Sequence, residues 1–347
     1  MSWLRRRAGA VVVQTAYMGD VILTTPLLSA LAERHGPVDV VATPTSAALL
    51  DTHPAVRAVI RYDKRGADRG WRGIRRVARL LRARGYAAAY LPQRSWRSAS
   101  LALLAGVPER VGFTDSPAGS LYTRKVPKPG YGHEAERLAA LAGVAVGAPL
   151  AAVTLGLSDV DRLDAERWLA SAGVLGEYVA FAPGSIWGAK RWPYYPALAA
   201  AIAWPIVVIG GPSDAALAAG VTEGAPTRVY SAAGSVGPRV SAALIERALA
   251  LVTGEAAPLH LATAVGTAVV ALFGPTVPSF GFGPRGPHDI VLGLDELLCR
   301  PCATQGPAAC PLEHHRCLRD LSVSTVADAL ASVVARAEEH RAIHYRH

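Results

Sequence analysis

The sequence predicts an α/β protein with two successive doubly wound domains. Apolar, strand-like runs alternate with helical patterns twice along the 347 residues, a rhythm typical of parallel sheets covered by helices. A chain of this length is also too long for one typical core. The runs lie at 10–14, 38–42, 57–61 and 86–91 in the first half, and at 178–184, 205–211, 248–254 and 267–276 in the second.

A stretch of small residues separates the two series of strands. Residues 143–158 (GVAVGAPLAAVTLGLS) carry no helical stripe, so we place the domain boundary there. We predict an N-terminal domain of residues 1–150 and a C-terminal domain of residues 151–347. Ligands bind outside the carboxyl ends of parallel strands in such folds, so we expect a site in a cleft between the halves.

Composition favours a cytoplasmic protein with anionic partners. The formal net charge is +9, while charge, Gly or Pro interrupts every apolar run before roughly 18 residues, so no membrane span is expected. The arginines at 5–7 precede a short apolar stretch, as in a signal peptide. We interpret them instead as the basic start of the first strand, because the apolar part is too short.

Much of the positive charge lies in residues 71–86 (WRGIRRVARLLRARGY), where arginines alternate with apolar side chains. A solvated helix face and a helix on a membrane surface are both open interpretations of this pattern. No helix-turn-helix, zinc-finger or single-strand stacking pattern accompanies the charge, so we expect no nucleic-acid partner.

An acidic residue follows the first apolar strand. Residues 10–14 (AVVVQ) lead directly into the turn that contains Gly19 and Asp20. Asp20 is either a helix cap or a catalytic group. Thr24 and Thr25 precede Pro26 and offer another helix start, which would leave Asp20 free for catalysis.

Two strand ends in the second half carry groups suited to binding phosphate and hydroxyl groups. Residues 181–193 (FAPGSIWGAKRWP) place Gly184 and Ser185 where backbone amides can approach a phosphate, and Lys190 adds a positive charge. The alternative is an ordinary turn followed by a surface lysine.

The next strand end, at Gly254, is followed by Glu255 and then by His260 one turn into a helix. A carboxylate there can bind sugar hydroxyls and a neutral histidine can donate to a phosphate. As structure alone, Glu255 would favour the helix dipole and His260 would be a satisfied polar residue.

Two further patterns point to metals. Asp159 and Asp161 resemble a metal-binding acidic pair, but Ser158 makes a capping box the better interpretation. The four cysteines, Cys299, Cys302, Cys310 and Cys317, have the spacing C-x2-C-x7-C-x6-C. This spacing predicts a structural zinc or iron held by an excursion at 299–317, with His314 or His315 as a possible replacement ligand. Reduced thiols in a loop are the alternative, and a cytoplasmic location disfavours disulfides.

These elements, in this order, resemble the bacterial ADP-heptose:lipopolysaccharide heptosyltransferases of glycosyltransferase family 9. The resemblance extends over about residues 10–330, and the middle segment is most similar to heptosyltransferase II, which adds the second inner-core heptose. The motifs that carry it are the Met18-Gly19-Asp20 turn, residues 89–113, residues 182–193 (APGSIWGAKRWP), residues 254–266 (GEAAPLHLATAVG) and residues 272–276 (LFGPT).

The resemblance implies two Rossmann-like domains facing across a cleft, the GT-B arrangement, with the donor mainly on the C-terminal half. It implies inverting transfer from ADP-L-glycero-D-manno-heptose to heptosyl-Kdo2-lipid A, with no cofactor required. Asp20 then corresponds to the proposed general base, Lys190 to the donor-phosphate lysine, and Ser185 and His260 to donor contacts. One departure is Glu255-Ala256-Ala257, where the family usually has Asp-Ser-Gly or Asp-Thr-Gly.

The implied acceptor is an anionic lipid in the inner leaflet, which places the protein peripherally on the inner face of the inner membrane. Arg94 and Arg97 are candidate contacts for its acidic groups, and Lys64 and Arg65 are weaker ones. A solvated loop is the alternative for each of them. Another acceptor (a protein or another surface glycan), another nucleotide sugar, or a non-catalytic scaffold stays open, although a scaffold needs neither Asp20 nor Lys190.

Overall fold

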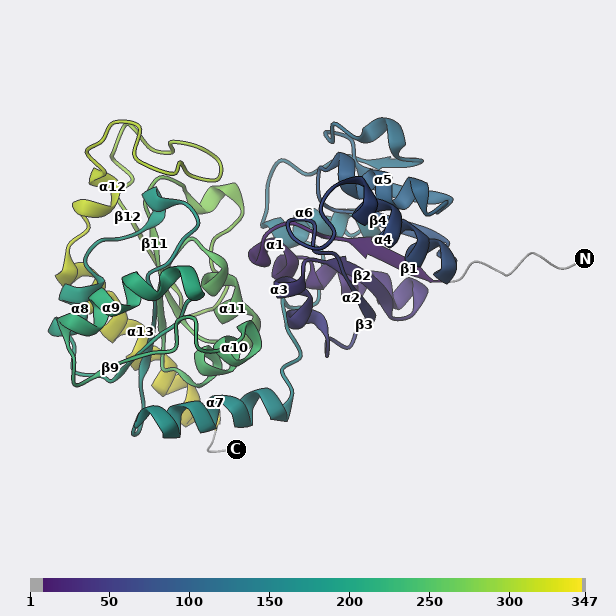
Figure 1. Ribbon diagram of the computed structural model, residues 1–347. Coiled ribbons are helices and arrows are strands. Elements are labelled where there is room, and N and C mark those ends of the chain that lie inside the picture. The colour runs from purple at the N-terminus through teal and green to yellow at the C-terminus, as the bar shows by residue number, and fades with distance from the viewer. Residues whose placement is uncertain (1–8, 345–347) are drawn as a thin grey trace, which may run out of the picture. The chain divides into compact units, whose positions relative to one another are not determined.

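The computed structural model describes residues 9–344 and divides into two compact units, with the division between Gly156 and Leu157 (Figure 1). Each unit contains one six-stranded parallel sheet with helices between successive strands. The predicted pair of Rossmann-like domains is therefore confirmed. The arginines at 5–7, interpreted above as the start of the first strand, lie outside the described residues.

The first sheet is built around a buried central strand. Its order is β3-β2-β1-β4-β5-β6. Successive strands are added on one side of β1 up to β3 and then on its other side from β4 onward. Every residue of β1 is buried, as expected for a parallel strand covered on both faces. The strands are β1 (Ala10–Val13), β2 (Val38–Ala42), β3 (Val56–Arg61), β4 (Ala88–Leu91), β5 (Glu109–Phe113) and β6 (Arg124–Val126).

The helices of this unit cover both faces of its sheet. Right-handed crossovers place α2 and α3 on one face, and α4 and α5 on the other, because the chain moves in opposite directions from β1. The helices are α1 (Met18–Leu23), α2 (Thr25–His35), α3 (Pro44–Ala47), α4 (Gly70–Arg84), α5 (Trp96–Leu104) and α6 (Glu134–Ala139), with short 3-10 turns η1 (Ala48–Leu50), η2 (Gly119–Leu121) and η3 (Ala140–Ala142).

The second unit repeats this plan with the order β12-β11-β10-β7-β8-β9, and β7 and β10 are the central pair. The strands are β7 (Val179–Ala182), β8 (Ile206–Val208), β9 (Val229–Ser231), β10 (Leu251–Gly254), β11 (Val269–Phe273) and β12 (Ile290–Gly293). The helices are α7 (Asp159–Ala172), α8 (Tyr195–Ala201), α9 (Ala215–Gly224), α10 (Pro238–Arg247), α11 (Ala257–Val265), α12 (Arg316–Arg319) and α13 (Val323–His344), with 3-10 turns η4 (Gly188–Lys190), η5 (Pro212–Asp214) and η6 (Pro278–Phe280). Between residues 9 and 344, no helix combines the length and apolarity needed to cross a bilayer.

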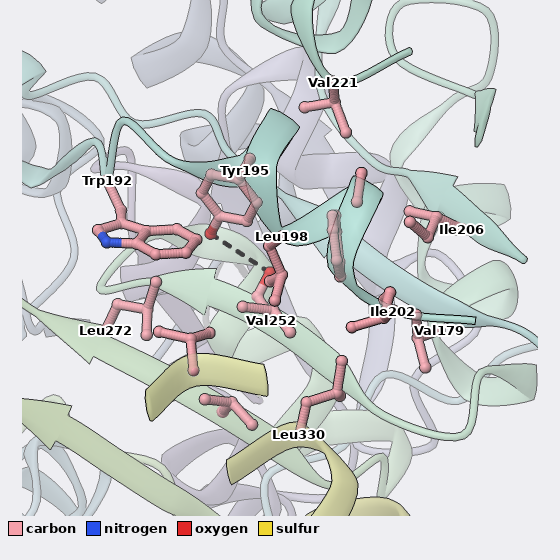
Figure 2. Close-up of a cluster of buried hydrophobic side chains, with 14 of the residues drawn as sticks. Val179, Trp192, Tyr195, Leu198, Ile202, Ile206, Val221, Val252, Leu272 and Leu330 are labelled. Carbon is pink, nitrogen blue, oxygen red and sulfur yellow. Dashed lines mark hydrogen bonds between the residues drawn. The ribbon is translucent and has the colours of Figure 1, made fainter. Parts of the chain in front are cut away.

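Aromatic side chains anchor the segment that follows η4 to the core of the second unit (Figure 2). Figure 2 shows Trp192 and Tyr195 packed among apolar side chains from the sheet and α13. The Trp192 indole N–H donates to the Leu321 carbonyl at 3.0 Å, and the Tyr195 hydroxyl lies 3.3 Å from the Ala182 carbonyl. The core thus fixes the chain two residues beyond Lys190.

Asp161, the second residue of the acidic pair at the start of α7, belongs to a capping box with Ser158. The Ser158 hydroxyl accepts the Asp161 N–H at 3.4 Å, and Asp161 Oδ2 accepts the Ser158 N–H at 2.7 Å. The Arg239 guanidinium also donates to Asp161 and holds the pKa of that carboxyl down to about 2. The capping-box interpretation is therefore confirmed.

Candidate active site

A buried ion pair connects two strand ends at the centre of the second sheet. Lys190 ends η4, which follows β7, and Glu255 directly follows β10, the strand beside β7. Lys190 Nζ lies 2.9 Å from Glu255 Oε2, and the two side chains are only 6% and 10% exposed. The Thr276 hydroxyl, beyond β11, donates to the same carboxylate oxygen. The structure therefore brings together two predicted donor residues, but as partners of each other.

Two glycines allow the chain to close around Lys190. A Cβ atom on Gly254 would lie 2.9 Å from the Lys190 carbonyl oxygen, so this position admits the backbone of η4. A Cβ atom on Gly306 would lie 2.7 Å from Lys190 Cε, and Gly306 has a φ of +82°, which side chains rarely adopt. Gly306 belongs to the cysteine-rich excursion, so this segment covers the aliphatic part of Lys190.

Hydrogen bonds fix the excursion to the loop that follows β11 and to the turn η4. The Cys302 N–H donates to the Pro275 carbonyl at 2.8 Å, just beyond β11. Arg300 Nη2 donates to the carbonyl oxygens of Phe273 and Thr276 at 2.9 and 3.0 Å. His315 Nε2 lies 2.8 Å from the Ala189 carbonyl of η4. Sequence reasoning treated the excursion as a separate structural element and missed these contacts.

The predicted metal site at the four cysteines is not supported. Within residues 9–344, no group of three or more His, Cys, Asp or Glu side chains is arranged to hold a metal, and all four thiols are free. Cys317 is buried in the apolar core, where burial raises the pKa of its thiol to about 11. Cys302 Sγ donates to the Cys299 carbonyl, and Cys310 Sγ accepts the His315 N–H. The chain spacing suits a metal, but hydrogen bonds to the backbone engage the thiols of Cys302 and Cys310, and packing engages that of Cys317.

The loop after β7 is shaped by two residues that sequence reasoning missed. The Ser185 hydroxyl accepts the Trp187 N–H at 3.2 Å, and the Ser185 carbonyl accepts two bonds from Arg191, at 3.0 and 2.7 Å. A Cβ atom on Gly184 would lie 2.4 Å from Asp214 Oδ1. Gly184 therefore makes room for a carboxylate. The contact between Arg191 and Ser185 could not be predicted from the sequence, because Arg191 donates to a backbone carbonyl, which every residue has.

His260 lies near the start of α11 and is 6% exposed. Its ring centroid is 6.4 Å from that of Phe282, in the loop after η6. This packing fixes the imidazole beside the loops that follow β10 and β11.

In the first unit, Asp20 lies in the first turn of α1, after the central strand β1. A separate helix, α2, does begin at Thr25, but Asp20 Oδ2 also accepts the Tyr17 N–H at 3.2 Å, so Asp20 takes part in capping α1. Burial, and to a smaller extent the nearby Glu134 carboxylate, together raise the pKa of Asp20 to about 6. The Tyr17 hydrogen bond and Lys128 oppose this shift. A carboxyl group with a near-neutral pKa is suited to proton transfer.

Basic side chains gather around Asp20. Lys64 donates to the Thr15 carbonyl at the end of β1, and burial lowers the pKa of its ammonium, with smaller contributions from Arg97 and Arg65. Asp20 acts on Lys64 in the opposite direction. Lys64 therefore lies within electrostatic reach of both Asp20 and Arg97, near the carboxyl end of β1.

The other two candidate arginines have partners. Arg94 Nη1 is 3.5 Å from Asp115 Oδ2 in an exposed pair. The Arg65 guanidinium lies 5.9 Å from the centroid of the Tyr17 ring.

A second buried ion pair near Asp20 was missed from the sequence. Lys128 Nζ lies 2.6 Å from Glu134 Oε1, and Arg137 Nη1 lies 3.3 Å from Glu134 Oε2. The Glu134 side chain is 7% exposed. No motif marks these residues, because β6 and α6, which they adjoin, reach the neighbourhood of α1 only through the tertiary fold.

Two Rossmann-like domains, each with charged groups at the carboxyl ends of its central strands, are typical of glycosyltransferases with the GT-B fold. Residues 74–311 match the model of glycosyltransferase family 9 (heptosyltransferase), and the chain belongs to this family. The family and fold implied by the sequence motifs are thereby confirmed.

Named relatives agree with this assignment. The chain is 30% identical over 334 residues to lipopolysaccharide heptosyltransferase 1 of Pseudomonas aeruginosa, covering 90% of each chain. It is 28% identical to lipopolysaccharide heptosyltransferase 2 of Salmonella typhimurium, covering 78% of this chain and 84% of the relative. The solved structure of the ADP-heptose lipopolysaccharide heptosyltransferase II of Escherichia coli is 24% identical, with a TM-score of 0.78, covering 95% of this chain and 99% of that one.

Proposed function

We propose that the protein transfers heptose, with inversion and without a metal, from ADP-L-glycero-D-manno-heptose to an inner-core acceptor, heptosyl-Kdo2-lipid A. We propose that residues 1–150 bind the acceptor, residues 151–347 bind the donor, and the protein acts peripherally at the inner face of the inner membrane. Family membership and the names of the relatives support the transfer. The observation that carries the proposal is the near-neutral carboxyl of Asp20 after the central strand of the first sheet.

Asp20 is the proposed general base. In an inverting transfer the acceptor hydroxyl attacks the anomeric carbon on the face opposite the leaving ADP, and a base removes the hydroxyl proton. Oδ2 of Asp20 is held by the Tyr17 amide, which leaves Oδ1 to take this proton. A pKa of about 6 makes the carboxylate both ionised and sufficiently basic near pH 7. The bond from the anomeric carbon to the ADP oxygen breaks in the same step.

Lys190 is the proposed partner of the leaving diphosphate. Negative charge accumulates on the ADP as the glycosidic bond breaks, and a fixed ammonium stabilises it without a metal. The Lys190 ammonium carries three protons, of which Glu255 accepts one. The others are available to the diphosphate. Thr276 and Glu255 thus hold Lys190 in one geometry before the donor binds.

The remaining donor contacts are proposed at the neighbouring loops. Glu255 Oε2 is occupied by Lys190 and Thr276, so Oε1 is the atom that would accept a sugar hydroxyl. The backbone at Gly184, Ser185 and Gly254, together with the His260 ring, would contact the nucleotide. The longer side chain of Glu255, compared with the usual aspartate of the family, brings the carboxylate to Lys190.

The acceptor is proposed to bind at the basic groups around Asp20. Lys64 lies within electrostatic reach of the base and Arg97 within reach of Lys64, and both suit carboxylate or phosphate groups of a Kdo-bearing lipid. Arg94 would exchange its exposed contact with Asp115 for the acceptor, at small cost. Assignment to the second transfer rests on the middle segment of the sequence, since relatives of both types have similar identities, 30% and 28%.

The test is ADP release by the purified protein from ADP-heptose, in EDTA, with Kdo2-lipid A, with heptosyl-Kdo2-lipid A, or with no acceptor. The proposal predicts release that depends on heptosyl-Kdo2-lipid A. Release with Kdo2-lipid A alone would assign the first transfer instead. No release with either lipid, from folded protein that binds ADP, would overturn the proposed substrates.

A further inference from the structure

Helices α4 and α5 expose large apolar side chains on the surface of the first unit. Trp71 and Leu80 of α4 are 51% and 43% exposed, and Trp96 and Leu103 of α5 are 52% and 42% exposed. Each helix also has a buried side that packs on the sheet. The exposed apolar residues are therefore additional to those that the fold needs.

The two helices form one continuous surface. They lie in contact with each other on the sheet (Figure 1). Their buried residues, including Ile74, Leu81 and Leu101, belong to the same core cluster. Arg82 Nη2 donates to the Leu104 carbonyl at 2.7 Å and joins α4 to the end of α5. We call the exposed side of this pair the α4–α5 face, defined by Trp71, Arg72, Arg75, Arg79, Leu80, Trp96, Arg97 and Leu103.

The charge of the α4–α5 face has one sign. Helix α4 contains six arginines and α5 contains one, while neither helix contains an acidic residue. Asp68 and Asp39 neutralise only Arg76 and Arg84. Arg72, Arg79 and Arg97 form no ion pair with any residue in the described part of the chain, and Arg75 lies over the Trp71 ring, 5.7 Å from its centroid.

We propose that the α4–α5 face docks on the surface of an anionic lipid bilayer. Tryptophan side chains favour the interfacial region of a membrane, where the ring is partly buried and the indole N–H stays hydrated. Arginines beside them pair with lipid phosphates, while their methylene groups cover apolar surface. A face that carries arginines and no acidic residues complements an anionic surface. The four exposed apolar side chains alternate with these arginines along the two helices.

The α4–α5 face continues into the proposed acceptor site. Arg94 and Arg97 lie just before and within the first turn of α5, on either side of Trp96. If the acceptor is the lipid-anchored sugar proposed above, docking by this face holds its head group beside these arginines. Only the placement of the acceptor head group beside these arginines rests on the proposed function. Docking on the lipid surface rests on the residues of the α4–α5 face alone.

The experiment is co-sedimentation of the full chain with vesicles in the absence of donor and acceptor. One set of vesicles is phosphatidylcholine alone, and the other contains about 30 mol% phosphatidylglycerol, a surface that attracts each basic residue about fivefold more strongly. The wild-type protein is expected to bind only the anionic vesicles, and less so in high salt. Arg72→Glu with Arg79→Glu is expected to weaken binding at least about 25-fold, by the loss of two such contributions. Insertion of Trp71 and Trp96 is also expected to change the intrinsic fluorescence of the wild-type protein when anionic vesicles are added. Trp71→Ala with Trp96→Ala is expected to weaken binding to vesicles and to abolish this change.

The matched control reverses the same number of charges in the second unit, with Arg319→Glu and Arg336→Glu, both exposed. This control is expected to retain most of the vesicle binding. Equal binding of wild-type protein to neutral and anionic vesicles, no binding at all, or an equal loss in the control variant would overturn the proposal. Transfer to a delipidated acceptor, expected to be unchanged in Arg72→Glu with Arg79→Glu, separates failure of this docking from failure of the proposed transferase.

Discussion

Lys190 Nζ and Glu255 Oε2 are 2.9 Å apart, and this buried contact joins the loops that follow the two central strands of the second sheet. Removing one partner of a buried pair leaves an uncompensated charge, which typically costs about 3–5 kcal/mol. Removing both leaves no buried charge. The stability role of the pair and the catalytic role of the ammonium can therefore be separated.

We expect Lys190→Met to lower kcat about 10²- to 10³-fold, because the diphosphate loses its fixed positive charge. The same variant is expected to unfold at a lower urea concentration. Lys190→Met combined with Glu255→Gln is expected to recover most of that stability but none of the activity. Urea unfolding and ADP release measure the two effects, and recovery of activity in the double variant would contradict the role of Lys190.

Asp20 combines a capping contact with the proposed base. The side-chain oxygen of asparagine can accept the Tyr17 N–H as aspartate does but cannot take up a proton, whereas alanine can do neither. Asp20→Asn is therefore expected to lose about 10²- to 10⁴-fold in kcat while remaining as well folded as the wild type. Asp20→Ala is expected to be about 1 kcal/mol less stable than Asp20→Asn, because it also loses the capping contact.

Thermal unfolding of Asp20→Asn at two pH values tests the burial of Asp20. Its pKa is higher in the folded protein, about 6, than its ordinary value of 3.8, so ionisation destabilises the fold. The wild type loses this stability as pH rises through about 6. Asp20→Asn is then expected to be more stable than the wild type at pH 8, with the difference vanishing near pH 4. A constant difference at both pH values would show that the carboxyl is not perturbed.

The pH dependence of kcat/KM on the acid side also reports the pKa of Asp20. Because the base must be ionised, kcat/KM is expected to fall about tenfold per pH unit below about 6. Glu134→Gln removes a negative charge that raises the pKa of Asp20 and frees Lys128, which lowers it. Both effects have the same sign, so the limb is expected to move to lower pH in this variant. A limb that stays in place would exclude Glu134 as an influence on the base.

Gly306 tests whether the cysteine-rich excursion positions Lys190. Gly306→Ala places a methyl group 2.7 Å from Lys190 Cε, at a φ of +82°. We expect kcat/KM for ADP-heptose to fall by about tenfold or more, since small displacements of a catalytic group are costly. Gly176→Ala is the matched control, with a φ of +75° and no atom within 4 Å of the added Cβ. It shares the backbone strain but is expected to leave kcat/KM unchanged.

The fold was largely predictable because the buried parallel strands are continuous apolar runs. The eight predicted strands match β1 to β4, β7, β8, β10 and β11. Of the four strands that were missed, β6, β9 and β12 are short strands at sheet edges, where most residues are partly buried or exposed. The run RKV of β6 carries no apolar signal. The capping box at Ser158 was also predictable, because all of its atoms lie within one turn.

The candidate site was predictable only as separate motifs. Asp20, Lys190 and Glu255 each stand out at the end of a strand, but the Lys190–Glu255 contact depends on β10 lying beside β7. The cysteine spacing favoured a metal because sequence distance says nothing of side-chain direction, and Cys317 points into the core. The Glu134 and Gly306 contacts likewise depend on tertiary packing alone.

The central claim is that this chain adds heptose to an inner-core acceptor with Asp20 as the base. The most direct measurement is mass spectrometry of heptosyl-Kdo2-lipid A after incubation with ADP-heptose and either wild-type protein or Asp20→Asn, at equal concentration in EDTA. The account predicts an acceptor heavier by one heptose residue with the wild type, and at most about one-hundredth of that rate with Asp20→Asn. An unmodified acceptor with the wild type, or an equal rate of modification by Asp20→Asn, would contradict it.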